Sequence, residues 1–214
     1  MEQFSVYKDI KARTGGEIYL GVVGPVRTGK STFIKRFMEL MVLPEIEDEH
    51  SRTQARDELP QSAAGKTIMT TEPKFIPKEA AEVALGDGID VQVRLIDCVG
   101  FMIDGAAGHI ENDSERLVKT PWFDYQIPFT KAAEIGTRKV ITDHSTIGIV
   151  VTTDGTIGDL KRSAYIPAEE RTVSELKELG KPFLLLLNSV KPFSDETRQI
   201  ALELSNKHGE SVHP

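Results

Sequence analysis

The apolar residues of the chain fall into two patterns. Short unbroken apolar runs are typical of buried strands, and apolar residues that recur every three or four positions are typical of helices. The runs occupy 18–23, 147–152 and 183–187, and the helical spacing occupies 31–43, 131–142, 167–179 and 195–208. Because strands alternate with helices, we predict an α/β fold whose mostly parallel sheet carries helices on both faces.

Other segments break this alternation. Gly86-Asp87-Gly88 separates the runs 82–85 and 91–96, which predicts a β-hairpin and one antiparallel edge strand. Residues 44–66 and 101–130 are charged or rich in Gly and Pro and have no period, so we expect long loops there. We expect the acidic stretches within both loops to be solvated rather than to bind metal.

Four aromatic residues lie close together in the second of these loops. Aromatic side chains bury large apolar areas both in cores and at interfaces. The group therefore either forms a contact between subunits or covers the sheet, and we favour the cover. The four residues are Trp122, Phe123, Tyr125 and Phe129.

The two ends of the chain lie outside the strongly patterned region. Residues 1–17 are polar and form an N-terminal extension, with a short amphipathic helix expected at about 6–12. The main domain then occupies 18–214. A βα unit normally returns to the sheet, and the chain ends soon after its last predicted helix. We therefore expect a fragment that is cut before its next strand.

Composition narrows the classes of protein. The chain has 214 residues, a formal net charge of −7 and a pI of about 5.3, which disfavours nucleic acid as a partner. A single cysteine, Cys98, allows no internal disulfide and fits a reducing compartment. The start does not resemble a signal peptide, and the apolar runs are too short to span a bilayer. The five histidines form no cluster with zinc-ligand spacing.

The segment after the first apolar run matches the P-loop pattern Gly-x-x-x-x-Gly-Lys-Ser. Its glycines let backbone N–H groups face phosphate, and the following helix directs its positive end at the same anion. Lys30 is expected to reach the β- and γ-phosphates, and Ser31 to hold Mg²⁺. The residues expected to contact the nucleotide here are Gly24, Pro25, Val26, Arg27, Thr28, Gly29, Lys30, Ser31 and Thr32.

Two further positions are expected to complete the magnesium site. Asp97 ends an apolar strand and is followed by Gly100, so the carboxylate is predicted to help to hold Mg²⁺ and the Gly100 amide to bind the γ-phosphate. Thr70 and Thr71 lie between the P-loop and Asp97, where nucleotide switches place a threonine that senses Mg²⁺ and phosphate. We expect one or both to act there; the alternative is a threonine-rich edge or turn.

The group that orients the attacking water is not evident. Phe101 follows Gly100, where some GTPases carry a glutamine, and an apolar ring cannot orient water. Hydrolysis must therefore use Thr70, Thr71 or Arg27, or be slow. Arg27 itself is either an internal arginine finger or a solvated side chain, and we favour the solvated one.

The last apolar run leads into a segment that predicts the base preference. Asn188, Ser189 and Lys191 stand where GTPases carry Asn-Lys-x-Asp, so Asn188 is kept and the aspartate is lost. Lysine donates hydrogen bonds only and cannot accept those of guanine. We expect Asn188 and Ser189 to contact the nucleotide and ATP to be preferred over GTP; the alternative is that this segment never touches the base.

Several long runs resemble the stage IV sporulation protein A family. Together they extend over essentially the whole chain and are far more specific than a P-loop alone. The matching runs are Gly24–Ser31, Asp57–Phe75, Ala133–Ile141, Asp143–Gly148 and Val151–Asp159.

The resemblance implies a GTPase-like P-loop fold of the TRAFAC type that binds ATP and Mg²⁺ and hydrolyses ATP. In that family Lys30 corresponds to the phosphate-binding lysine, Asp97 to the magnesium-organising aspartate, and Thr70 and Thr71 to threonines implicated in hydrolysis. The family polymerises into the basement layer of the spore coat, at the forespore surface in the mother-cell cytoplasm. Its docking involves other coat proteins, a small amphipathic membrane-associated peptide and a C-terminal region, so this chain alone is expected to dock and polymerise poorly.

Three functions remain open at this point. The first is a Mg²⁺-dependent ATPase whose hydrolysis drives a conformational change that permits assembly. The second is a structural module that binds nucleotide and hardly turns it over, which Phe101 favours. The third is a GTPase with an unusual base pocket, for which GTP should compete as well as ATP.

Overall fold

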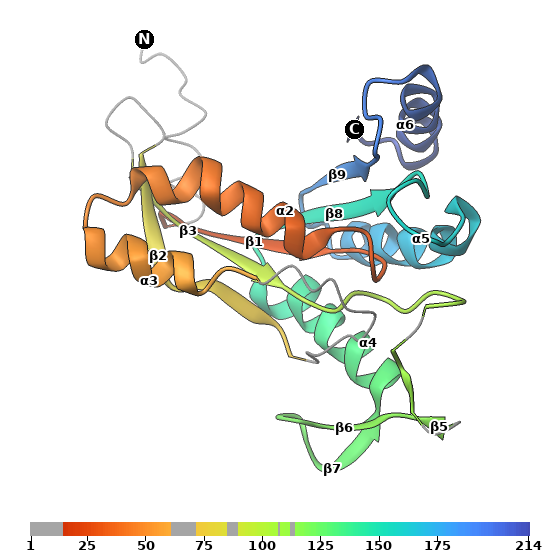
Figure 1. The fold of residues 1–214 in the computed structure, drawn as a ribbon, viewed down its shortest axis with the longest axis horizontal. Coiled ribbons are helices and arrows are strands. Elements are labelled where there is room, and N and C mark those ends of the chain that lie inside the picture. Colours follow the sequence, from red (N-terminus) through yellow and green to blue (C-terminus); the bar gives the residue numbers. More distant parts are fainter. Residues whose placement is uncertain (1–14, 61–71, 85–89, 107, 112–113) are drawn as a thin grey trace.

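A six-stranded sheet forms the centre of the molecule in a computed structural model that describes residues 15–60, 72–84, 90–106, 108–111 and 114–214 (Figure 1). The strand order is β10-β9-β8-β1-β3-β2, and β2 is the antiparallel edge strand, as predicted. The strands are β1 (Glu17–Val23), β2 (Lys74–Ala84), β3 (Asp90–Asp97), β8 (Ile147–Thr153), β9 (Phe183–Asn188) and β10 (Val212–His213).

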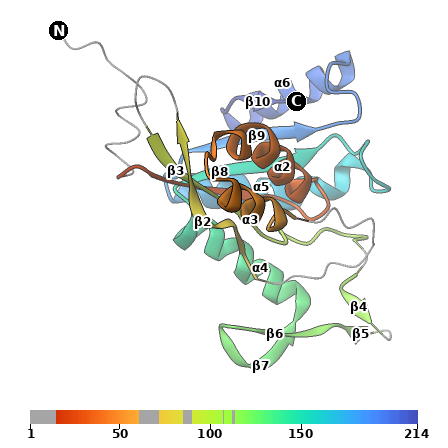
Figure 2. The same cartoon turned by 60° about the vertical axis from the view of Figure 1, so that its left-hand side comes forward.

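Helices pack on both faces of this sheet (Figures 1 and 2). The first face carries α2 (Lys30–Phe37), which continues through a π-helical turn at Met38–Val42, and α3 (Glu49–Asp57). The second face carries α4 (Phe129–Lys139), α5 (Arg162–Glu178) and α6 (Asp195–His208). The mostly parallel α/β arrangement predicted from the apolar pattern is therefore confirmed.

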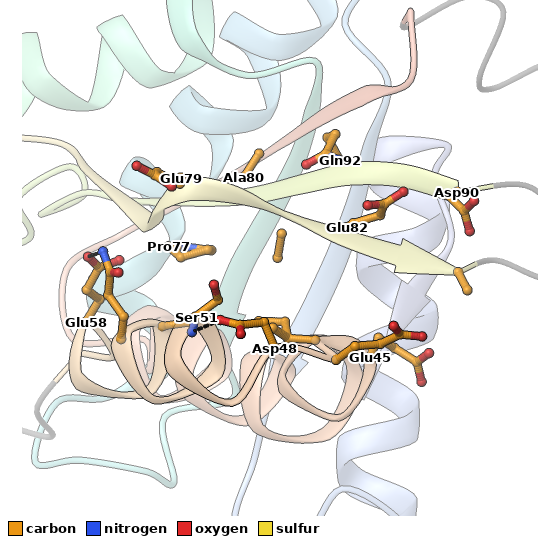
Figure 3. A pocket seen from close by; sticks show the side chains of 16 residues that line it. Glu45, Asp48, Ser51, Glu58, Pro77, Glu79, Ala80, Glu82, Asp90 and Gln92 are labelled. Carbon is orange, nitrogen blue, oxygen red and sulfur yellow. Dashed lines mark hydrogen bonds between the residues drawn. The ribbon is translucent and has the colours of Figure 1, made fainter.

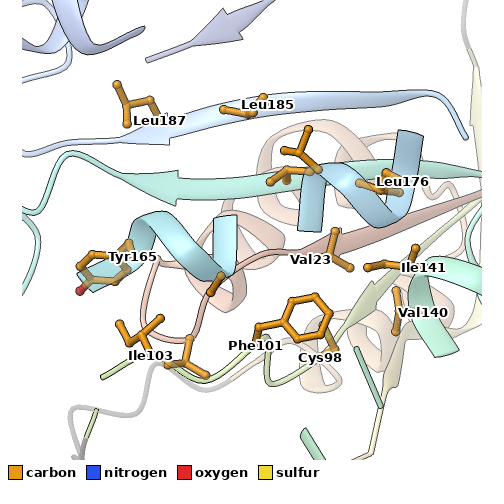
Figure 4. Packing of buried hydrophobic residues seen from close by; sticks show 14 of the residues in the cluster. Val23, Cys98, Phe101, Ile103, Val140, Ile141, Tyr165, Leu176, Leu185 and Leu187 are labelled. Carbon is orange, nitrogen blue, oxygen red and sulfur yellow. The ribbon is translucent and has the colours of Figure 1, made fainter. Parts of the chain in front are cut away.

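Strands buried on both faces explain the unbroken apolar runs. Successive side chains of a strand point to opposite faces, so Val22 packs under α2 while Val23 packs on the other side. Leu95 and Ile96 of β3 are divided in the same way. Figure 4 shows the core on the face that carries α5, where Val23 and Leu185 of the sheet pack in one cluster with Leu176 of α5. Each such buried side chain contributes about 1.5–3 kcal/mol.

Part of the segment 44–66 is helical, so our expectation of a long loop was wrong there. Asp48 begins α3 as its N-cap, because the Asp48 carboxylate accepts a 2.7 Å hydrogen bond from the Ser51 amide. Ala55 is the buried residue of this helix. A helix that buries a single small side chain shows no apolar period, which is why the pattern did not reveal it.

Two other helices begin earlier than we predicted. α4 starts at Phe129 instead of 131, and α5 starts at Arg162, so Pro167 lies inside α5 and not near its start. Proline removes one backbone hydrogen bond from a helix interior. Tyr165 is almost fully buried in the turn before Pro167, and its packing offsets that loss.

The segment 101–130 contains two small ribbons rather than only loop. β4 (Ile110–Glu111) pairs with β5 (Ser114–Glu115), and β6 (Leu117–Thr120) pairs with β7 (Phe123–Pro128). The β6–β7 hairpin projects beyond α4, away from the main sheet (Figures 1 and 2).

The aromatic residues of this segment do not act together as a cover of the sheet. Tyr125 has 64% of its surface exposed and Phe123 37%, so the favoured interpretation was wrong for these two. Phe129 is fully buried at the start of α4, and Trp122 lies beside the Lys139 ammonium.

The end of the chain returns to the sheet. Val212 and His213 pair in parallel with Leu185 and Leu186, so our expectation that the chain stops before its next strand was wrong. The preceding helix α6 has the predicted limits, with Ser194 as N-cap and Gly209 in a left-handed conformation after it. The helix expected at 6–12 and the turn Gly86–Gly88 lie outside the described residues. Within the described part of the chain, no helix is both long and apolar enough to cross a bilayer.

Candidate functional site

The candidate site lies at the edge of the sheet where the parallel strands end. β1, β3, β8 and β9 run in the same direction, so the segments that follow them lie along one edge. Ligands of open α/β sheets bind at the carboxyl ends of the strands. The segments after these strands begin at Gly24, Cys98, Asp154 and Ser189.

The loop between β1 and α2 requires its two motif glycines. Gly24 has a φ of 128° and Gly29 a φ of 91°. A methyl group on Gly24 would lie 2.4 Å from the Val151 carbonyl oxygen, and one on Gly29 would lie 2.4 Å from Nδ2 of Asn188. Both positions combine left-handed backbone with close packing, which only glycine tolerates. The predicted strand–loop–helix context of the motif is confirmed.

Polar side chains organise the interior of the loop. Oγ1 of Thr28 donates to the Pro25 carbonyl at 3.1 Å, and Nζ of Lys30 donates to the same oxygen at 2.5 Å. Nδ2 of Asn188 donates to the Thr28 carbonyl at 3.0 Å, which ties the end of β9 to the loop. Thr28, Pro25 and Val26 are buried, whereas Thr32 is exposed on α2. This contact puts Asn188 beside the loop, while its contact with the nucleotide stays a prediction.

Lys30 is a buried cation inside this turn, with 5% of its surface exposed. Burial lowers the pKa of its ammonium, and the neighbouring Cys98 and Asp97 act in the opposite direction. Taking an ammonium out of water is costly unless an anion compensates it. A phosphate oxygen at this point would supply that compensation.

Ser31 and Asp97 form the part of the site that fits a divalent cation. Oγ of Ser31 donates to Oδ2 of Asp97 at 2.7 Å, while Oδ1 of Asp97 is buried without a hydrogen-bond partner. Burial raises the pKa of the Asp97 carboxyl, and the bond from Ser31 opposes that rise. A hydroxyl and a carboxylate with a free buried oxygen are hard ligands of the kind that Mg²⁺ takes.

Protein ligands alone do not complete a metal site. Among the described residues, no three His, Cys, Asp or Glu side chains are grouped so that they could hold a metal ion. Mg²⁺ is commonly bound through one or two protein ligands together with substrate phosphates and water. The Ser31–Asp97 pair beside Lys30 therefore fits Mg²⁺ that arrives with a nucleotide.

Phe101 is attached to the P-loop by its backbone. Its amide donates to the Gly24 carbonyl at 3.1 Å, and its carbonyl accepts from the Val26 amide at 2.9 Å. The ring is 2% exposed and lies 4.3 Å from the guanidinium carbon of Arg171. Phe101 is thus a buried packing residue, and its ring is not placed to orient water.

Gly100 differs from the sequence expectation, whereas Cys98 agrees with it. The Gly100 amide, expected to bind the γ-phosphate, donates instead to Oγ1 of Thr137 in α4 at 3.1 Å. The Cys98 thiol is buried, and this burial raises its pKa to about 11. Cys98 is therefore a neutral core residue, as expected, and not a nucleophile.

The remaining predicted catalytic residues are not settled by this geometry. Thr70 and Thr71 lie outside the described residues. Arg27 is exposed and has a φ of 61°, and its charge acts to lower the pKa of the Tyr165 hydroxyl against the larger, raising effect of burial. Both interpretations of Arg27 remain predictions.

The segments after β8 and β9 are joined by an aspartate that sequence reasoning missed. Oδ2 of Asp154 accepts from Oγ1 of Thr197 at 3.2 Å, and Oδ1 accepts from the Thr156 amide at 2.9 Å. Oγ of Ser189 lies 3.1 Å from the same Thr197 hydroxyl and accepts from the Lys191 amide at 3.0 Å. Lys191 itself is exposed. Asp154 lies in the run 151–159 that resembles the family, but no motif assigns it a role, so sequence reasoning did not single it out.

A separate hollow of about 580 Å³ lies between α3 and β2 (Figure 3). Seven of its sixteen lining residues are acidic and none is basic. Such a lining repels a triphosphate, so the hollow is not an alternative nucleotide site. The acidic residues are Glu45, Glu47, Asp48, Glu58, Glu79, Glu82 and Asp90.

The fold and the site together define an α/β protein with a P-loop at the carboxyl edge of its sheet. The chain belongs to the family described as stage IV sporulation protein A, ATPase domain, whose sequence profile matches residues 1–214. The family resemblance seen in the sequence is therefore confirmed.

Three relatives, all named stage IV sporulation protein A, match nearly the whole chain. The Bacillus subtilis (strain 168) protein is 62% identical over 97% of this chain, and the Bacillus anthracis protein is 58% identical over 97%. The Clostridioides difficile (strain 630) protein is 53% identical over 98%. The chain spans 42–43% of the length of these relatives.

Two solved structures resemble this chain weakly. Crystal structures of two mutation variants of SsGBP align over 95% of this chain and 50% of theirs, at 15% identity and a TM-score of 0.45. A likeness this weak supports no inference about function.

Proposed function

We propose that this chain is a Mg²⁺-dependent ATPase domain that converts ATP to ADP and phosphate. The observation that carries the proposal is the Ser31–Asp97 pair beside buried Lys30, because a cation and an anion there would satisfy both an orphaned carboxylate oxygen and a desolvated ammonium. The match to an ATPase-domain family supports it independently.

The roles of the chain's own residues follow from this geometry. Lys30 would bind the β- and γ-phosphates together with amides of the loop other than that of Val26, which donates to the Phe101 carbonyl. Mg²⁺, when bound with the nucleotide, neutralises developing charge on the phosphates. Ser31 and Asp97 would hold that ion, and Asn188 ties the loop to the end of β9. The antiparallel β2 beside β3 supports the proposed GTPase-like, TRAFAC-type topology.

ATP is the proposed nucleotide because of residues 188–191, the base segment, which stands where GTPases carry Asn-Lys-x-Asp. Lys191 cannot accept the hydrogen bonds of guanine, and it is exposed. The Asp154 carboxylate, which could accept them, already accepts bonds from Thr156 and Thr197. A GTPase with an unusual base pocket is therefore the weaker alternative.

The residue that orients the attacking water is also a matter of proposal. Thr70, Thr71 and Arg27 are the candidates, since Phe101 is a buried packing residue. The same position of Phe101 favours the second candidate function, a module that binds nucleotide with negligible turnover.

For the whole protein, we propose assembly into the basement layer of the spore coat at the forespore surface, with hydrolysis driving a change that permits polymerisation. The proposal rests on the family, which is named for a sporulation stage, and on the relatives of the same name that match nearly the whole chain. Other coat proteins and a small amphipathic membrane-associated peptide are the proposed partners, through regions beyond this domain.

Lys30→Ala tests the enzymatic proposal. We expect it to lower ATP affinity at least about a hundredfold, because it removes a charge-assisted contact to two phosphates. Lys35→Ala is the matched control: it lies on the same helix and pairs only with Glu39 in the described structure, so it should bind like the parent. Isothermal titration with ATP and GTP gives affinity and preference.

Single-turnover release of phosphate separates the two candidate functions. A parental chain that binds ATP and releases phosphate within minutes is an ATPase, and one that binds ATP without release is a binding module. If Lys30→Ala hydrolysed ATP at the parental rate, that result would contradict both candidate functions.

A further inference from the structure

We propose that Thr137 is a positioning residue that competes with the terminal phosphate of a nucleoside triphosphate for the Gly100 amide. The inference rests on the proposed function and deepens it, since it names a residue to which no nucleotide-binding motif assigns a role. Thr137 acts through Gly100 and does not itself touch the nucleotide.

Gly100 lies against the phosphate-binding lysine. It has a φ of 96°, and a methyl group built on it would lie 2.5 Å from Nζ of Lys30 and 2.3 Å from the Gly24 carbonyl oxygen. No side chain fits between Gly100 and the Lys30 ammonium. A phosphate held by Lys30 therefore comes within reach of the Gly100 amide.

Thr137 holds that amide through its side-chain hydroxyl. Its hydroxyl is fully buried in α4, donates to the Ala133 carbonyl at 2.8 Å and accepts from the Gly100 amide at 3.1 Å. A hydroxyl has one donor and two acceptor sites, so its single proton is committed to the helix and its lone pairs face Gly100. Without Thr137, the buried Gly100 amide would keep, among the described residues, only the weakly accepting Cys98 sulfur as a polar neighbour.

The neighbouring residue cannot follow a movement of Gly100. Phe101 is held by two backbone hydrogen bonds to the P-loop and by the Arg171 guanidinium over its ring. The amide of Gly100 can still turn, because glycine adopts left-handed and right-handed backbone about equally readily. The geometry thus offers the Gly100 N–H two oxygen acceptors, the Thr137 hydroxyl and a phosphate oxygen.

The outcome of this competition depends on the charge of the acceptor. A hydrogen bond to an anionic oxygen is roughly twice as strong as one to a neutral oxygen, so the terminal phosphate takes the amide. A diphosphate lacks that oxygen and leaves Gly100 on Thr137. Thr137 therefore reduces triphosphate affinity selectively, by the free energy of the bond that must be broken.

The test compares Thr137→Val with Thr137→Ser in the 214-residue chain. Isothermal titration with ADP and with a non-hydrolysable ATP analogue, both with Mg²⁺, gives the ratio of their dissociation constants. Valine keeps the shape and removes the acceptor, so we expect the preference for triphosphate to rise about tenfold while ADP affinity stays at the parental value. Serine keeps the hydroxyl and should show the parental ratio.

An unchanged ratio in Thr137→Val, or an equal loss of affinity for both nucleotides, would show that Thr137 has only a structural role. If Thr137→Val does not fold, the backbone amide NMR signal of Gly100 in the parental chain decides. We expect the triphosphate analogue to shift it and ADP to leave it, and equal shifts would overturn the inference. A parental chain that binds neither nucleotide refutes the proposed function, which is a different result from binding with an unchanged ratio.

Discussion

Asp97 places function and stability in opposition at a single residue. Its Oδ1 atom is buried without a partner, and burial raises the pKa of the carboxyl. The unfolded carboxyl loses its proton at a lower pH than the folded one, so ionisation near neutral pH favours unfolding. A residue chosen for stability alone would not carry this charge.

Asp97→Asn should therefore raise the free energy of unfolding of the nucleotide-free chain by about 1 kcal/mol at about pH 7. The gain should shrink as the pH falls toward about 4 and disappear below about pH 3, where the carboxyl is protonated in both states. Affinity for ATP with Mg²⁺ should fall, because an amide is a poorer ligand of Mg²⁺ than a carboxylate. Urea unfolding at both pH values and ATP titration measure the two effects.

Asp90→Asn is the control, since Asp90 is exposed at the other end of the same strand. It should leave both stability and ATP affinity at the parental values. A less stable Asp97→Asn protein would contradict the argument that the bare carboxylate is a cost to the fold.

Contiguous motifs made some site residues predictable. Gly24, Lys30 and Asn188 could be placed because their residue types and spacing are tied to phosphate and loop geometry. Thr137 and Asp154 could not, because their roles depend on which backbone amides and hydroxyls face them in the fold. The same holds for the Gly100 amide, whose acceptor lies 37 residues further along the chain.

At the scale of elements, α6 shows how a single cap defines a helix. Oγ of Ser194 accepts a hydrogen bond from the Thr197 amide at 3.2 Å, at the point where the helix begins beside the proposed base segment. Replacing such a cap by alanine leaves a backbone amide without its partner. The helix start would then fray next to Ser189.

Ser194→Ala should lower the free energy of unfolding by about 1 kcal/mol, measured by urea denaturation. Ser174→Ala is the matched control, because Ser174 is exposed in the interior of α5 and alanine is the better helix former there. The control should be neutral or slightly stabilising. Equal losses in the two variants would mean that the cap contributes nothing.

Elements were predictable where they bury a regular apolar pattern. The runs of β1, β8 and β9 and the limits of α6 satisfied that condition. α3 buries only Ala55, and the β6–β7 hairpin exposes most of its residues, so neither has a pattern to detect. β10 is only two residues long and is defined by pairing with β9 rather than by its own composition.

At the scale of the whole molecule, a buried ionic network joins β8, α5 and α6. Glu169 of α5 is fully buried, accepts from Oγ1 of Thr152 at 2.5 Å and pairs with Arg162 at 2.7 Å. His208, at the end of α6, lies 3.6 Å from the same carboxylate. The network therefore links the helices of one face to the strand next to β1.

Glu169→Ala should destabilise the chain by about 3–5 kcal/mol, because it leaves the Arg162 charge without its partner. Glu170→Ala is the control: the adjacent carboxylate is exposed and pairs with Lys207 at the surface, so the loss should be below about 1 kcal/mol. Chemical denaturation measures both. If Glu169→Ala lowered the free energy of unfolding only slightly, water would have to solvate Arg162 as well as the carboxylate does, and this prediction would be wrong.

The position of Cys98 has a practical consequence. The chain has one sulfhydryl, and it is buried behind the P-loop with a pKa of about 11. A thiol-directed reagent reaches it only during transient opening of the sheet edge, so the rate of labelling reports how often that edge opens. The rate of Cys98 labelling in the unaltered protein thus measures local opening at the proposed nucleotide site. A ligand that binds only the closed form should lower that rate, and a tighter ligand should lower it more.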